Sequence, residues 1–340
     1  MKKLSIVLVA IFGLNVASSA QDKGVFSGNF QSNFSVFLKD SLIGATEAAS
    51  PQYGRQISSS EAWLFLNYDI KGFHFAVRYD LFNNSNLLNP SGAYTGQGIG
   101  FWQIKKSIGD LELTAGSFYD QFGSGILFRA FENRLIGIDY AMQGLRAKYR
   151  IGDDITIKAF TGKQKGFQDN RFGTSPQIIK GINAEKNTIF ENGVVLNTGV
   201  SAINRTLDEN TMSQIVTEIN ALPLEQRFYP KYNVYGMNGY FDLNWKNFGV
   251  SGEYNFKTQE ALRDRLGELF SSNGSVLLGS VSYSKRRLGK NKKGGIGINA
   301  QYRRMENFPL TVSPYVSLLN GIITYQPSFS RQASYRMLAR

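Results

Sequence analysis

Few residues in this sequence could do chemistry. The chain holds one histidine, His74, and no cysteine, which excludes disulfides, thiolate metal sites and a cysteine nucleophile. His74 is expected to share a strand face with Arg78 and Asp80, but no serine lies two residues after it, as a phospholipase-type site needs, and no Asp-x-His pair stands nearby. One histidine cannot build a zinc site. We therefore interpret His74 as a structural residue and expect no catalytic residue, no metal and no cofactor.

Two glycine-rich segments resemble nucleotide-binding loops only superficially. Residues 96–100 have glycine at every second position, and three of residues 294–297 are glycine. Neither segment has the strand-to-helix context or the following residues that a phosphate-binding loop requires. We interpret both as glycines at the start of strands, and the Asp153-Asp154 pair as a turn rather than a calcium loop.

The first twenty residues are typical of an export signal. Lys2 and Lys3 precede an apolar run over residues 4–14, and small residues up to Ala20 close the segment. The apolar run is shorter than the ~20 residues that a membrane-spanning helix needs. We predict a signal peptide over residues 1–20, cleaved after Ala20, followed by one domain over residues 21–340.

Composition favours β-structure and argues against nucleic-acid binding. The chain has 35 Gly, 25 Phe and 17 Tyr but only 8 Pro. Its formal charge of +12 falls to +10 without the two lysines of the signal peptide, and the basic residues are scattered along the chain. No nucleic-acid-binding motif is present. We therefore predict no nucleic-acid partner.

Side chains alternate between apolar and polar along much of the chain, which is the period of a β-strand. Residues 61–69 and 73–82 alternate on either side of a two-residue turn, Lys71-Gly72, and are predicted to form a hairpin. Further segments with the same pattern cover residues 26–38, 98–106, 111–119, 142–150, 155–163, 235–244, 248–257, 276–285, 295–304, 310–319 and, more weakly, 331–340. This predicts at least twelve strands, most of them near the ~9–11 residues that a tilted strand needs to cross a bilayer.

The connections alternate between short turns and long loops, as in a barrel whose N-terminus lies in the periplasm. Long loops are expected over residues 39–58, 83–97, 120–141, 164–234 and 258–275. The longest carries a helix signal, because Thr206 and Glu209 form a capping box and an apolar stripe over residues 215–222 ends at Pro223. We predict one long loop with a short helix, folded over or into the barrel mouth, with a solvated loop as the alternative.

Alternation alone suits a soluble sandwich as well as a barrel. The export signal, the strand length, the one-sided long loops and tyrosines near strand ends favour an all-β fold, an antiparallel transmembrane β-barrel of the outer membrane. Apolar side chains such as Phe30, Leu66, Val77 and Val250 are then expected to face lipid. The polar side chains are expected to line a lumen: Asn29, Gln31, Asn33, Glu61, His74, Arg78, Asp80, Glu112, Arg146, Lys148, Lys158, Glu253, Asn255, Asn299, Gln301 and Arg303. Such a lumen could be water-filled with a bias toward anions, or closed by Arg–carboxylate pairs.

One segment is distinctive beyond its period. It runs through Gly116, Phe118, Tyr119, Gln121, Phe122, Gly123, Gly125, Arg129, Phe131, Glu132, Arg134, Gly137 and Asp139. It resembles a motif in a family of uncharacterised outer-membrane β-barrel proteins from Bacteroidota, most strongly over residues 111–163. The resemblance implies a fold and a location but no reaction. Because members are usually longer and complete barrels end on an aromatic residue, we expect a barrel truncated at Arg340, with unconventional closure as the alternative.

Charged residues are concentrated in the same segment, between two predicted strands. Charge-assisted pairs there could pin the loop inside the barrel as a latch or constriction, and an ordinary solvated loop is the alternative. The predicted latch residues are Tyr119, Gln121, Arg129, Glu132, Arg134 and Asp139.

These features predict a non-enzymatic outer-membrane barrel, acting as a passive or gated porin-like conduit or as a subunit of an envelope assembly. The expected partners are outer-membrane lipid and lipopolysaccharide, other envelope proteins, and small solutes if the lumen is open. The alternatives are an outer-membrane barrel enzyme, such as a hydrolase that uses His74, and a soluble exported β-rich binding protein. A TonB-driven receptor is disfavoured because no plug domain precedes the first predicted strand.

Overall fold

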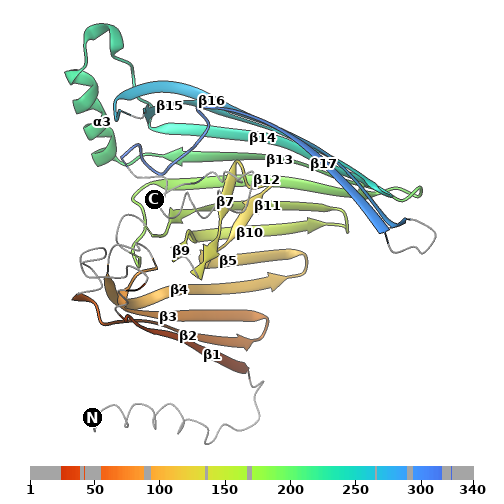
Figure 1. Cartoon of the computed structure of the whole chain (residues 1–340), viewed down its shortest axis with the longest axis horizontal. Helices are drawn as coiled ribbons and strands as arrows, with labels where there is room; N and C mark the ends of the chain where they lie inside the picture. The colour runs from red at the N-terminus through yellow and green to blue at the C-terminus, as the bar shows by residue number, and fades with distance from the viewer. Residues whose placement is uncertain are drawn as a thin grey trace, which may run out of the picture.

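One large antiparallel sheet dominates the computed structural model, which describes residues 24–38, 42, 55–87, 93–134, 137–166, 171–264, 266–288, 294–315 and 323. In this part of the chain the sheet has thirteen strands, which follow one another in chain order (Figure 1). Four short strands, β6 to β9, leave the sheet between β5 and β10 and form two hairpins of their own. The prediction of an all-β antiparallel fold with at least twelve strands is confirmed.

The strands are long enough to cross a bilayer at a tilt. The bounds of those in the large sheet are β1 Val25–Val36, β2 Ser58–Ile70, β3 Phe73–Ser85, β4 Tyr94–Ile108, β5 Leu111–Phe118, β10 Met142–Ile151, β11 Ile155–Gln164, β12 Ile178–Ile189, β13 Val194–Thr206, β14 Asn233–Trp245, β15 Phe248–Arg263, β16 Leu269–Leu288 and β17 Gly294–Glu306.

The two faces of the sheet differ sharply in exposure. In β3, Val77 and Tyr79 are each 40 % exposed. The residues that alternate with them are buried: Arg78 is 3 % exposed and Asp80 is 1 % exposed. The apolar side chains therefore point outward and the charged ones point inward. Apolar residues cover the outer face of most of the other strands in the same way. Soluble monomers rarely expose an apolar surface this extensive, so this face fits a lipid environment.

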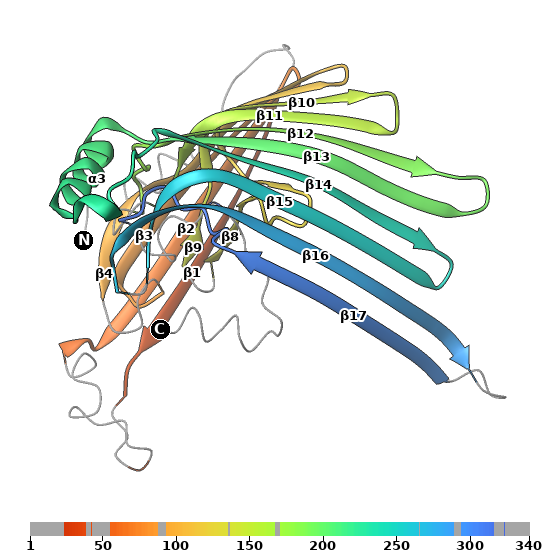
Figure 2. The ribbon, with the colours of Figure 1, turned by 90° about the horizontal axis from the view of Figure 1, so that it is seen from above.

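The sheet curls but does not close within the described residues. Figure 2 shows the curved sheet with β8 and β9 on its concave side. In the described ranges β1 pairs only with β2, and β17 pairs only with β16. The turn between β2 and β3 has Lys71 and Gly72 at φ of 49° and 73°, the conformation of a tight hairpin turn, as the sequence predicts.

Two predicted long loops are wrong. The region 164–234 contains two further strands, β12 and β13, and the region 258–275 is mostly strand, because β15 continues to Arg263 and β16 begins at Leu269. The exposed face of β12 carries Lys180 and Lys186 between its isoleucines, which interrupts the apolar alternation that marks the other strands. The strand signal of β12 is therefore weak in the sequence.

The predicted helix is present as α3, Glu209–Ala221, beyond one end of the strands (Figure 1). Its N-cap is Asp208, whose carboxylate accepts a hydrogen bond from the Thr211 amide at 3.2 Å, so the capping box predicted at Thr206 is wrong. Ile215 and Ile219 are buried against the ends of β15 and β16. Within the described ranges, no helix combines the length and the apolar character needed to cross a membrane.

The strand predicted over residues 310–319 is also wrong where the structure describes it. Residues 307–315 form an irregular segment on the concave side, and Phe308, Leu310 and Val312 are buried there. Their alternation reflects packing against an interior core rather than against lipid. The predicted signal peptide, most of the predicted loop 39–58 and the predicted strand 331–340 lie outside the described residues.

Candidate functional site

The segment between β5 and β10, residues 119–141, folds onto the concave face of the sheet; we call it the insert. It contains β6 Asp120–Phe122, β7 Phe128–Ala130, β8 Glu132–Asn133 and β9 Ile138–Asp139, paired as β6–β7 and β8–β9. Gly123 and Gly125, at φ of 53° and 92°, let the chain turn tightly between β6 and β7. A loop predicted as a latch or constriction is thus a folded element inside the curve of the sheet.

The β6–β7 hairpin has an apolar core shared with the wall. Phe122 and Phe128 pack on Phe160 of β11, with ring centroids 5.7 and 4.6 Å away. Inward-facing wall residues and the segment after β17 complete this cluster: Ile179, Ile203, Val234, Val276, Phe308, Leu310 and Val312. Burial of each large side chain stabilises such a cluster by about 1.5–3 kcal/mol. The interior of the curved sheet is therefore filled at this level rather than open.

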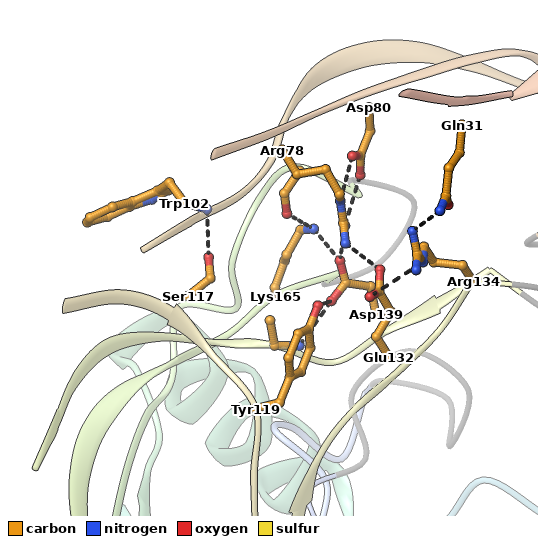
Figure 3. Close-up of polar contacts among 12 residues, drawn as sticks. Gln31, Arg78, Asp80, Trp102, Ser117, Tyr119, Glu132, Arg134, Asp139 and Lys165 are labelled. Carbon is orange, nitrogen blue, oxygen red and sulfur yellow. Dashed lines mark hydrogen bonds and ion pairs between the residues drawn. The ribbon is translucent and has the colours of Figure 1, made fainter. Parts of the chain in front are cut away.

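A network of ion pairs holds the β8–β9 hairpin to β3 (Figure 3); we call it the Arg78 cluster. The Arg78 guanidinium donates to both oxygens of Asp80, at 2.7 and 3.0 Å, and to Asp139 Oδ2 at 2.9 Å. It also pairs with Glu132. Lys165, just after β11, donates to Asp139 Oδ2 at 2.5 Å and to the carbonyl of Gly100. One buried arginine thus joins a strand of the wall to both strands of the hairpin.

Two further contacts extend the Arg78 cluster. The Tyr119 hydroxyl donates to Asp139 Oδ1 at 2.9 Å. Arg134 donates to Gln31 of β1 at 3.0 Å, and its guanidinium lies 5.0 Å from the ring centroid of Phe65. The insert is therefore tied to β1, β2 and β3 on one side and to the end of β11 on the other.

The charge states in the insert follow from these contacts. Burial and the negative charges of Asp139 and Glu132 raise the pKa of the Tyr119 hydroxyl, so it remains a donor. Burial alone would raise the pKa of Asp139, but the positive charges of Lys165 and Arg78 outweigh that effect, and its pKa lies below the ordinary value. Burial raises the pKa of Glu132 despite its pairing with Arg78.

A glycine in β4 makes room for the Arg78 cluster. A Cβ at Gly100 would lie 1.9 Å from Asp80 Oδ2. Gly100→Ala is therefore expected to displace the Asp80 carboxylate and to speed trypsin cleavage at Arg134 about tenfold, because a charge-assisted bond is worth about 1.5–3 kcal/mol. Gly279→Ala, where a Cβ meets nothing within 4 Å, is the matched control. Equal cleavage rates in the two variants would contradict this role of Gly100.

A second ion-pair network lies on the wall beside the β6–β7 hairpin. Arg146 of β10 donates to Asp120 at 2.6 Å and to Glu112 of β5 at 2.9 Å. Lys158 of β11 lies 3.4 Å from Asp120 and 3.6 Å from Glu185. Asp120, the first residue of β6, is thus held between two cations of the wall.

A third network holds the segment that follows β17. Arg205 lies 3.0 Å from Glu260, and Lys257 pairs with the same carboxylate. Arg205 donates to the carbonyl of Thr311 at 2.9 Å, and Lys257 donates to that of Pro309 at 3.0 Å. Two buried cations therefore share one carboxylate and bind the backbone of the segment.

Strand register places the residues predicted to line the lumen on the face that carries the insert, and the structure brings some of them together. Arg78 and Asp80 join the predicted latch residues Tyr119, Glu132 and Asp139, and Gln31 meets Arg134. Arg146, Glu112 and Lys158 form the second network. Of the remaining latch residues, Gln121 bonds within its own hairpin, and Arg129 lies over Phe131.

Other predicted residues lie apart from these clusters. His74 shares the inner face of β3 with Arg78 and Asp80, but it bonds to Asp69 at 2.8 Å near the β2–β3 turn and takes no part in the Arg78 cluster. Asn299 and Gln301 are exposed on β17. Lys165, Asp120 and the Arg205 network were missed by sequence reasoning. No local pattern marks them, since Arg205 stands between Asn204 and Thr206, and Asp120 stands between Tyr119 and Gln121.

Comparison with solved structures found partial likenesses at low sequence identity. The match with OprB of Pseudomonas putida covers 82 % of this chain and 75 % of the OprB chain, at 13 % sequence identity and a TM-score of 0.42. The match with OccK8 (OprE) of Pseudomonas aeruginosa covers 83 % of this chain and 94 % of the OccK8 chain, at 11 % identity and a TM-score of 0.35. The match with OmpT, an outer membrane protein of Vibrio cholerae, covers 91 % of this chain and 96 % of the OmpT chain, at 12 % identity and a TM-score of 0.32. These likenesses concern the fold alone.

Comparison with curated proteins found no match. The Bacteroidota origin implied by the sequence stays a prediction. The sequence model of DUF6029, described as a family of unknown function, matches residues 1–340, so the chain belongs to that family.

Proposed function

We propose that this protein is a non-enzymatic outer-membrane barrel that conducts small solutes through a lumen narrowed by the insert. The observation that carries the proposal is the apolar core of the β6–β7 hairpin, which packs on inward-facing residues of the wall. A wide, permanently open pore has no such core across its interior. The proposal is therefore a gated conduit.

The outer face of the sheet supports a membrane location. Leu64, Leu66, Val77 and Tyr79 are exposed side by side on β2 and β3, where strand register pairs Leu64 with Tyr79 and Leu66 with Val77. In water this apolar surface would cause protein molecules to associate. In the hydrocarbon of a bilayer it is stable without being buried against protein. Outer-membrane lipid and lipopolysaccharide are accordingly the proposed surroundings.

The contacts of His74 support a non-enzymatic role. Its Nδ1 bonds to Asp69, and no serine, threonine or tyrosine hydroxyl bonds to this ring among the described residues. A His–Asp pair without a nucleophile is incomplete for hydrolysis. We propose that the pair stabilises the β2–β3 hairpin near its turn.

A subunit of an envelope assembly is the second candidate. The same insert that narrows a conduit would seal a barrel whose role is to hold partners. Ion pairs at both ends attach the insert to the wall, which suits either role.

Recordings in planar bilayers separate the two candidates. The full chain, refolded in detergent and checked by circular dichroism for β-structure, is expected to give small or intermittent current steps. The expected physical reason is that ions pass only around the insert or when it moves. A folded protein that never conducts would overturn the conduit proposal and leave the assembly role.

A further inference from the structure

A row of polar side chains crosses the inner wall at the level of the insert. Strand register pairs Asn183 of β12 with Ser201 of β13, Ser201 with Asn238 of β14, and Asn238 with Asn255 of β15. Their exposed fractions are 0 %, 6 %, 7 % and 0 % in that order. We call these four residues the amide row.

The amide row has hydrogen-bonding capacity that the described residues do not use. Asn183 donates to Ser201 Oγ and to the Tyr240 hydroxyl, both at 2.9 Å, but its Oδ1 has no partner among the described residues. Asn238 donates to Glu253 at 3.0 Å, and its Oδ1 also lacks a described partner. Neither polar atom of the Asn255 side chain has one. Buried polar groups are normally paired, so three such amides in one row call for an explanation.

The β6–β7 hairpin covers this row. On one side of it, the Ser124 amide donates to Glu253 at 3.1 Å. On the other side, a Cβ at Gly236 would lie 2.7 Å from Leu127 Cδ1. Register places Glu253 two residues before Asn255 and Gly236 two residues before Asn238, so the hairpin touches the wall on both flanks of the row. The hairpin therefore lies over the row and contributes to its burial.

The balance of free energies favours a cover that can be displaced. Burial of the large apolar side chains of the hairpin stabilises the covered state. Each unpaired buried polar group opposes it. The Arg78 cluster holds the β8–β9 hairpin, whereas β6–β7 bonds to the wall beneath it mainly through Asp120 and Ser124. The β6–β7 hairpin can thus lift while the rest of the insert stays fixed.

We propose that the amide row is a binding strip for an uncharged, hydroxyl-rich solute, and that the β6–β7 hairpin is the gate that uncovers it. The proposal rests on the conduit function proposed above. The unused groups are three carbonyl oxygens and one amide donor, and hydroxyl groups both donate and accept. The charged groups that flank the row already have partners, since Lys158 pairs with Glu185, and the Glu253 carboxylate accepts from Asn238 and from the Ser124 amide.

Single-channel recording with two neutral probes tests the strip. Sucrose is expected to lengthen the open bursts of the full-length protein at least threefold, and a polyethylene glycol of the same hydrodynamic radius is expected to leave them unchanged. Asn238→Leu combined with Asn255→Leu is expected to abolish the sucrose effect and to reduce openings, because the cover then buries one unpaired group, Asn183 Oδ1, in place of four. Asn197→Leu, at an exposed position of β13, is the matched control.

The outcomes separate this inference from the conduit function. Absence of any conductance would defeat the conduit function. Conductance with bursts that respond equally to sucrose and to the polymer, or that respond to sucrose in the double variant, would overturn the strip alone.

Thiol labelling gives a second readout that does not depend on the leucine variants folding. The chain has no cysteine, so Ser201→Cys introduces a single thiol in the covered row. A methanethiosulfonate reagent is expected to label it at least tenfold more slowly than Asn197→Cys, and sucrose is expected to slow the labelling of Ser201→Cys alone. Equal rates at the two positions, or no protection by sucrose, would overturn the proposal.

Discussion

Replacing Arg78 with leucine is expected to detach the β8–β9 hairpin from the wall and to widen the path through the barrel. The Arg78 guanidinium is buried and contacts three carboxylates, those of Asp80, Glu132 and Asp139. Without it, Lys165 and Arg134 remain as ion-pair partners of these carboxylates, and the charge of Arg171 acts on Asp80 and Asp139 from further away. Removing one partner from a buried ionic network costs about 3–5 kcal/mol, so the detached state should become at least a hundredfold more populated.

Limited proteolysis and conductance measure this change. Trypsin is expected to cleave the Arg78→Leu variant at Arg134 about two orders of magnitude faster than the parent chain, and the current through single channels is expected to rise. Arg150→Leu is the control, since Arg150 and Asp110 form an exposed pair 3.8 Å apart, which contributes little to stability. An Arg78→Leu protein that folds, resists trypsin and conducts like the parent would show that the cluster does not hold the insert.

Much of the fold follows from residue alternation alone. In β3 the outward residues Val77 and Tyr79 and the inward residues Arg78 and Asp80 could be assigned without coordinates, because a strand has a period of two and lipid accepts only one of the two sets. The Lys71-Gly72 turn fixed the register of β2 against β3. These features are local in sequence, and local physics determines them.

The contacts of the candidate site are not local. Arg78 and Asp139 are 61 residues apart, and Ser124 and Glu253 are 129 apart. The concentration of charge in residues 129–139 predicted a latch, but no pattern indicated that Lys165 would complete it. Pairing across the interior depends on how the sheet curves, which alternation does not encode.

The same alternation also hides a second apolar environment. Phe308, Leu310 and Val312 repeat every two residues like a lipid-facing strand, yet they are buried against the insert on the concave side. An interior core and a bilayer both accept apolar side chains, so the period alone cannot distinguish them. The charged residues beneath this segment do distinguish them, because a buried arginine and lysine that bind backbone carbonyls have no place on a lipid-facing surface.

The buried charges of Arg205 and Lys257 lead to the second prediction with a large expected effect, which concerns residue Glu260 between them. Glu260→Gln is expected to release residues 307–315 from the wall, because it leaves Arg205 and Lys257, each 1 % exposed, without a negative charge nearby in the network. Two uncompensated buried cations repel each other, and removing their counter-charge costs about 3–5 kcal/mol. Chymotrypsin is expected to cleave after Leu310 about a hundredfold faster than in the parent chain, and the urea concentration at the unfolding midpoint is expected to fall.

Lys257→Met separates charge imbalance from simple loss of contact. This variant removes the bond from Lys257 to Pro309 but keeps the Arg205–Glu260 pair at 3.0 Å, so the network becomes neutral. Its effect is expected to be at least tenfold smaller than that of Glu260→Gln, since an apolar side chain can replace a buried charge when the remaining ions are matched. Glu306→Gln, in an exposed pair with Arg304, should change neither rate. Equal cleavage of the Lys257 and Glu260 variants would mean that the number of contacts, and not the buried charge, holds the segment inside the barrel.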